Sequence, residues 1–129
     1  MTGESIIKLH LKGDVVVLNA PEDIRQEMLK MGFSTCLDPT RKSENTLVFV
    51  TTQEELLLFL DNDLKHIAYD GMLWFLYSKG TPNLKPDINR NILWKLTADY
   101  GIRPVVAVSF NERWSALRFR PVEKVISKT

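Results

Sequence analysis

Short apolar runs alternate with helix-patterned segments along this chain, and this alternation constrains its fold more than any other feature. The runs at residues 14–19, 46–50 and 73–77 are each followed by a segment with apolar residues at helical spacing. Short continuous apolar runs are typical of strands buried on both faces of a sheet. Because parallel strands need a crossover connection, the repeated strand-helix order predicts a parallel sheet with helices on both faces.

Two further strand-like runs follow, at residues 104–110 and 115–119, joined by a short polar turn. Such a turn predicts a hairpin, so the last strand should run antiparallel to the others. We therefore predict an α/β fold, a three-layer Rossmann-like sheet that is mostly parallel and has a C-terminal antiparallel hairpin. With 129 residues and no linker-like tract, residues 1–129 are expected to form a single domain.

Local signals predict where the helices begin and end. Thr52 and Glu55 have the spacing of a capping box, and Asp87 is a good N-cap for the third helix. The helix after Thr52 is expected to bury apolar residues as far as Ile67 and to end before Asp70.

The composition excludes several broad classes of function. With 17 basic and 16 acidic residues the net charge is +1, so no overall field favours nucleic acid or an anionic membrane. No apolar run approaches the ~20 residues that span a bilayer, and the N-terminus lacks a secretion-signal pattern. Cys36 is the only cysteine, which excludes an internal disulfide and favours a cytoplasmic location; it is either a reactive thiol or an inert small residue.

Four motifs carry a resemblance to known proteins. They are Ser-Lys-Gly at 78–80, Asp-Ile-Asn-Arg at 87–90, Gly-Ile-Arg-Pro-Val at 101–105 and Trp-Ser-Ala-Leu-Arg-Phe-Arg-Pro at 114–121. The order of elements is similar to the class I methyltransferase-like Rossmann core, in which a hairpin places one antiparallel strand back into the sheet. The motifs resemble a family of small, uncharacterised bacterial proteins with a trimmed version of this core. That family has no assigned activity, so the resemblance implies a fold rather than a reaction.

The chain departs from methyltransferases where its first predicted strand ends. In those enzymes a glycine-rich turn lets the backbone approach the cofactor, whereas residues 18–23 here read Leu-Asn-Ala-Pro-Glu-Asp. The strands that would present an acid to the ribose are reduced to residues 33–38, with a short edge strand expected at 33–37. The resemblance therefore implies S-adenosylmethionine as a candidate cofactor whose usual turn is absent.

Residues that follow the predicted strands are candidates for ligand binding, because open α/β sheets bind ligands at the carboxyl ends of their strands. Asn19 follows the first strand, and Lys79 and Gly80 follow the third. Lys79 and Gly80 either bind an anionic group in a crevice or are an ordinary loop lysine and turn glycine. Asn89 and Arg90 lie at a helix start near the same edge. Asn89 could serve the turn, whereas Arg90 gains nothing from a positive helix end and either binds an anion or pairs with a carboxylate.

The closing strand carries charges where a buried strand should be apolar. Arg118 and Arg120 alternate with apolar residues and so face one side of the sheet. Partial burial of Arg118 would be costly without a carboxylate, and our hypothesis is that it pairs with Asp87. Trp114, at the hairpin, either stacks on a ligand or partner or packs as ordinary core.

The sequence contains no metal-binding or catalytic motif. His10 and His66 have no Cys, His or acid at metal-ligand spacing, so no metal site is predicted, and nucleophile and phosphate-loop motifs are absent. We predict a small cytoplasmic binding or regulatory module without catalysis of its own, with a protein or small molecule as partner. One alternative is an S-adenosylmethionine- or nucleotide-binding protein or enzyme related to methyltransferases. Another is a homo-oligomeric interaction protein, for example a homodimer through an exposed sheet edge or the hairpin.

Overall fold

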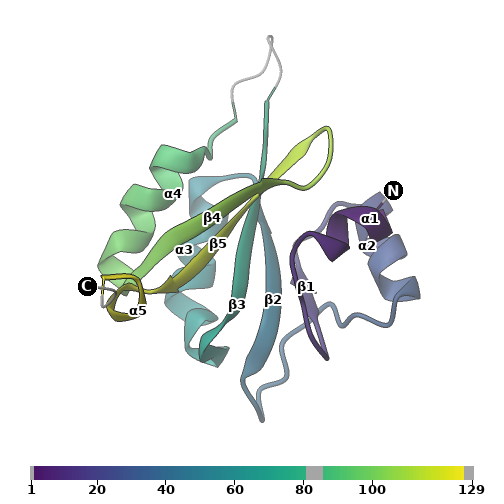
Figure 1. The fold of residues 1–129 in the computed structure, drawn as a ribbon, viewed down its shortest axis with the longest axis horizontal. Helices are drawn as coiled ribbons and strands as arrows, with labels where there is room; N and C mark the ends of the chain where they lie inside the picture. Colours follow the sequence, from purple (N-terminus) through teal and green to yellow (C-terminus); the bar gives the residue numbers. More distant parts are fainter. Residues whose placement is uncertain (1, 81–85, 127–129) are drawn as a thin grey trace.

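Five strands form one sheet in the order β1-β2-β3-β5-β4 (Figure 1) in a computed structural model that describes residues 2–80 and 86–126. β1 (Val16–Leu18), β2 (Ser43–Val50) and β3 (Ile67–Ser78) are parallel. β5 (Trp114–Pro121) pairs antiparallel with β3 on one side and with β4 (Ile102–Ser109) on the other. The predicted α/β sheet with a C-terminal antiparallel hairpin is confirmed.

Helices cover both faces of this sheet, as predicted. Within the described residues the α-helices are α1 (Thr2–Ile7), α2 (Glu22–Lys30), α3 (Gln53–Asn62), α4 (Arg90–Thr97) and α5 (Val122–Ile126). Short 3-10 turns follow α3 and α4, at Leu64–His66 and Ala98–Tyr100. Figure 1 shows α1 and α2 beside β1, α3 behind the strands, and α4 to the left of β4.

The central strands have one apolar core on each face. Leu47 of β2 belongs to the core under α2, and the next residue, Val48, belongs to the core under α3 and α4. The continuous apolar runs are explained by this alternation, since both faces of each strand are buried. Phe75 of β3 makes edge-to-face contacts with Phe59 and Phe119, at ring-centroid distances of 5.5 and 5.1 Å. Each such pair adds about 1 kcal/mol beyond the burial of its surface.

β3 begins earlier than the sequence pattern predicted. Ile67 was expected on the preceding helix but is the first residue of this strand. Asp70 was expected in a turn but lies inside the strand with a φ of 57°, at a shift in the register between β2 and β3. Gly71 follows, and a β-carbon there would lie 3.1 Å from the carbonyl oxygens of Ala68 and Glu44. This bulge places polar residues within a strand, which obscures the pattern that predicts strands.

The cap of α3 is formed by two residues from distant parts of the sequence. The hydroxyl of Thr52 accepts a hydrogen bond from the backbone of Glu55 at 3.1 Å, as predicted, whereas the carboxylate of Glu55 accepts from the backbone N–H of Thr51 at 2.7 Å instead of that of Thr52. The carboxylate of Asp87, expected to cap α4, instead accepts from the backbone N–H of Gln53 at 2.7 Å. Asp87 therefore caps α3, and it connects the start of α3 to the segment before α4.

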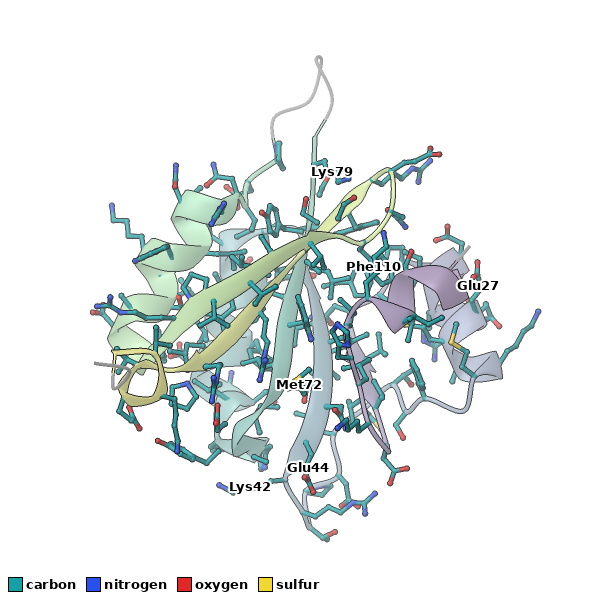
Figure 2. All side chains as sticks on the ribbon, in the orientation of Figure 1. Glu27, Lys42, Glu44, Met72, Lys79 and Phe110 are labelled. Carbon is teal, nitrogen blue, oxygen red and sulfur yellow. The ribbon has the colours of Figure 1, made fainter. Side chains whose placement is uncertain are left out.

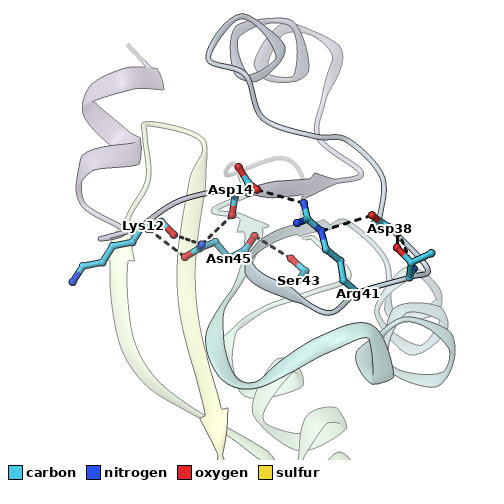
Figure 3. Close-up of polar contacts among 7 residues, drawn as sticks. Lys12, Asp14, Asp38, Arg41, Ser43 and Asn45 are labelled. Atoms are coloured by element: carbon cyan, nitrogen blue, oxygen red, sulfur yellow. Dashed lines mark hydrogen bonds and ion pairs between the residues drawn. The ribbon is translucent and has the colours of Figure 1, made fainter.

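The loop between α2 and β2 closes the outer edge of the sheet. The predicted edge strand at residues 33–37 is reduced to one bridge, in which Ser34 bonds the backbone of Val15 and Val17 at 2.9 and 2.8 Å. Figure 3 shows the polar network beside it. The amide of Asn45 donates to the carbonyls of Lys12 and Asp14, while the guanidinium of Arg41 lies 3.4 Å from Asp14 and 3.7 Å from Asp38.

Candidate functional site

An open crevice of about 1320 Å³ lies at the carboxyl ends of β1, β2 and β3. Its walls come from α1, the start of α2, the segment before α4 and the β4–β5 hairpin, and its base includes Val50 of β2 and Ser78 of β3. Figure 2 shows Lys79 and Phe110 at this end of the sheet, with Lys42 and Glu44 at the opposite end. A crevice at this edge is where open α/β sheets bind ligands.

The turn after β1 has a backbone conformation that usually requires glycine. Asn19 adopts a φ of 62°, in the left-handed region, and its side chain is exposed. Asparagine tolerates this region better than other residues with a β-carbon. The chain thus keeps a glycine-like turn without a glycine. Asn19 itself does not line the crevice, whereas Pro21 and Asp23, two and four residues later, do.

Gly80 lines the crevice and Lys79 lies at its rim. Gly80 has a φ of 77°, and its N–H donates to the hydroxyl of Ser78 at 3.1 Å. The ammonium of Lys79 instead lies 2.5 Å from the hydroxyl oxygen of Ser109 on β4, to which it donates. The backbone N–H of Lys79 donates to the carbonyl of Arg113 at 2.8 Å, which fixes the hairpin beside the end of β3.

Asn89 and Arg90 lie outside the crevice lining. The side-chain oxygen of Asn89 accepts from the N–H of Ile92 at 2.9 Å, so Asn89 is the N-cap of α4. Arg90 is exposed on the first turn of that helix. The residues just before them, Asp87 and Ile88, do line the crevice.

Trp114 is packed beneath the hairpin. Its side chain is 8% exposed and meets the ring of Phe49 edge-on at 4.9 Å. The side-chain oxygen of Asn111 accepts from the N–H groups of Arg113 and Trp114, both at 2.8 Å, and so shapes the turn. Of the two alternatives for Trp114, the structure shows core packing, with one edge of the residue lining the crevice.

The predicted ion pair between Arg118 and Asp87 is wrong. The guanidinium of Arg120, two residues along β5, donates to both carboxylate oxygens of Asp70 at 2.9 and 2.8 Å. These bonds from Arg120 lower the pKa of Asp70. Sequence alternation placed the two arginines on one face correctly, but the bulge in β3 brings Asp70 to Arg120, and Asp87 is bonded to Gln53 at the start of α3.

Arg118 is partly buried, and its Nε donates to no acceptor among the described residues. The buried Nε1 of its cross-strand neighbour Trp74 also donates to no acceptor among the described residues. Burial, and then the charge of Arg120, lower the pKa of Arg118, while Asp70 partly opposes this effect. Arg118 does not line the crevice, and its cross-strand neighbours are Trp74 on β3 and Val106 on β4.

Sequence reasoning did not predict four charged residues of the crevice lining, which are Lys8, Asp23, Glu112 and Arg113. Lys8 follows α1, a helix that was not predicted, and Asp23 lies in the first turn of α2. Arg113 belongs to the hairpin turn. Only Asp23 had a usable signal, because it follows a predicted strand at the ligand-binding edge.

The sheet order, with an antiparallel strand between β3 and β4, defines a methyltransferase-like α/β core. No family model and no curated protein matches the sequence. Solved structures match at low identity, and they are methyltransferase-like. The ribosomal protein L11 methylase from Lactobacillus delbrueckii subsp. bulgaricus has a TM-score of 0.57 at 12% identity, over 93% of this chain and 76% of that chain.

Two further similar structures contain cofactor-type ligands. DhpI in complex with SAH has a TM-score of 0.55 at 13% identity, over 93% of this chain and 72% of DhpI. LepI in complex with SAM has a TM-score of 0.56 at 11% identity, and this chain spans 40% of its length. At these identities the likeness establishes the fold, so the predicted methyltransferase-like core is confirmed. No helix among the described residues combines the length and apolarity needed to cross a membrane.

Proposed function

We propose that this protein is a binding module that holds S-adenosylmethionine or a related adenosyl compound in the crevice, without catalysis of its own. The observation that carries the proposal is the open crevice at the carboxyl ends of three parallel strands, beside a turn with the left-handed backbone of Asn19. The fold is shared with proteins whose structures contain SAM or SAH.

The residues of the crevice fit an adenosyl group in part. The carboxylates of Asp23 and Asp87 can accept hydrogen bonds from ribose hydroxyls, whereas Ile24 and Ile88 are buried in the two cores beneath the crevice. Asp38, in the stretch that replaces the missing strands, lines a separate cavity at the opposite edge and cannot serve the ribose. Because the carboxylate of Asp87 already accepts from the backbone of Gln53, Asp23 is the acid we assign to the ribose.

Thermal unfolding in the presence of S-adenosylmethionine, S-adenosylhomocysteine and ATP tests the proposal. A ligand at ~100 times its dissociation constant adds about 2.7 kcal/mol to the free energy of unfolding, which raises the melting temperature by roughly 10 °C for a chain of this size. Asp23→Lys should weaken binding about tenfold, whereas Glu27→Lys, exposed on the same helix and outside the crevice lining, should not. Absence of stabilisation by all three ligands would contradict the proposal, and turnover of S-adenosylmethionine would favour the enzymatic alternative.

A homodimer through the β4 edge is a second candidate function. β4 is the last strand of the sheet, and Val105 and Val106 at its middle are 37% and 44% exposed. Exposed apolar edge strands are templates for pairing with another chain. Sedimentation equilibrium should show a dimer that Val106→Lys dissociates, and a monomer at all concentrations would rule this candidate out.

A further inference from the structure

The hairpin end of the crevice carries a basic cluster, made by Lys8, Lys79 and Arg113. Lys8 donates to the carbonyl oxygen of Ser109 at 2.9 Å, and Lys79 donates to the hydroxyl of the same residue at 2.5 Å. Lys8 and Arg113 line the crevice. The residue after α1 and the residue after β3 thus bring two ammonium groups to one serine, and Arg113 lies on the turn of the same hairpin.

Although three acids also line the crevice, the cations of this cluster form no ion pair among the described residues. The ion pairs there involve Glu22, Asp14, Asp38 and Asp70, and none of these acids pairs with a residue of the cluster. Of the acids that line the crevice, Glu112 belongs to the same hairpin, while Asp23 and Asp87 belong to the walls formed by α2 and the segment before α4. Two ammonium groups that converge on one serine and pair with no acid favour the binding of an anion.

The size of the crevice allows more than one ligand. Small-molecule pockets usually measure roughly 300–1,000 Å³, and this crevice measures about 1320 Å³. An adenosyl compound at Asp23 would leave the hairpin end accessible.

We propose that the basic cluster binds a second, anionic small ligand, recognised through a carboxylate or phosphate group. This inference rests on the proposed function for the identity of the first ligand, because it assigns the remaining part of the same crevice. Lysine ammonium groups and the guanidinium of Arg113 form charge-assisted hydrogen bonds with oxyanions.

Inorganic phosphate and citrate are the probes, each compared with sodium chloride at equal ionic strength. Thermal unfolding of the whole chain gives the stabilisation, and titration calorimetry gives the dissociation constant. Lys8→Gln and Lys79→Gln keep a hydrogen-bonding group and remove the charge, and Lys95→Gln on the exposed side of α4 is the matched control. We expect each crevice variant to weaken phosphate binding about fivefold or more, and the control to leave it unchanged.

The outcomes separate this inference from the proposed function. Equal stabilisation by phosphate and by chloride, or an unchanged phosphate affinity in both lysine variants, would overturn the inference even if S-adenosylhomocysteine binds. A phosphate site that depends on both lysines supports it even if no adenosyl compound binds. If saturating S-adenosylhomocysteine abolishes phosphate binding while 5′-methylthioadenosine, which lacks the carboxylate, does not, the cluster binds the carboxylate of the adenosyl ligand, and the assignment to a second ligand is wrong.

Discussion

Replacing Asp70 with asparagine tests the bidentate ion pair between the neighbouring strands β3 and β5, whose two residues are far apart in the sequence. Two charge-assisted bonds of 2.9 and 2.8 Å join Asp70 to Arg120, and the two side chains are 22% and 30% exposed. Exposed pairs contribute about 0–1 kcal/mol, and breaking a fully buried pair costs about 3–5 kcal/mol. Asparagine tolerates the φ of 57° and can keep one acceptor for Arg120, so the substitution removes mainly the charge.

We expect Asp70→Asn to lower the free energy of unfolding by about 1.5 kcal/mol at pH 7, between these two limits. For a chain of this size that corresponds to a melting temperature lower by roughly 6 °C. Urea unfolding of the wild type, Asp70→Asn and the control Glu27→Gln measures the difference, and the control should stay within about 0.5 kcal/mol of the wild type.

The pH dependence gives a second measurement of the same interaction. The hydrogen bonds from Arg120 lower the pKa of Asp70 in the folded chain below its value of about 3.9 in the unfolded chain. The unfolded carboxylate therefore binds a proton first, and the stabilisation is complete above about pH 5 and is lost as pH falls through the folded pKa. The difference in the free energy of unfolding between the wild type and Asp70→Asn should therefore be smaller at pH 3 than at pH 7. An equal difference at both pH values, or a loss below 0.5 kcal/mol at pH 7, would refute the reasoning.

Three other substitutions have expected outcomes, each measurable by urea unfolding. Arg118→Met should raise the free energy of unfolding by about 1 kcal/mol, because it removes a partly buried cation whose Nε has no acceptor among the described residues. The control Arg103→Met, at an exposed position on β4, should change the free energy of unfolding little. Asn89→Ala should cost about 1 kcal/mol through loss of the α4 cap, and Asn91→Ala, exposed on the same helix, should not. Gly101→Ala should cost about 1 kcal/mol, because its φ of 78° lies in the left-handed region; no loss would show that the turn relaxes.

The sequence predicted the order and type of the main elements well, because these depend on local patterns. The run at residues 46–50 lies within β2, and the hairpin runs at 104–110 and 115–119 lie within or next to β4 and β5. The boundaries of β3 were wrong, since a bulge at Asp70 interrupts the apolar pattern and a 3-10 turn separates the strand from α3.

The candidate site was predicted only in part. Gly80 and Trp114 line the crevice, but Lys79 is bonded to Ser109, and Asn89 caps a helix. A position after a strand indicates which edge of the sheet a residue occupies. It does not indicate where the side chain points, because that depends on residues contributed by other elements.

The sequence by itself determined the α/β class, the parallel strands and the antiparallel hairpin, because hydrophobic periodicity and turn residues act over a few positions. Tertiary structure decided which charges meet. Asp70 and Arg120 are 50 residues apart, and Lys8 and Ser109 are 101 residues apart, yet both pairs are in hydrogen-bond contact. Such contacts depend on strand register, on one bulge and on where α1 packs, and a difference of one residue in register would exchange the faces on which these side chains lie.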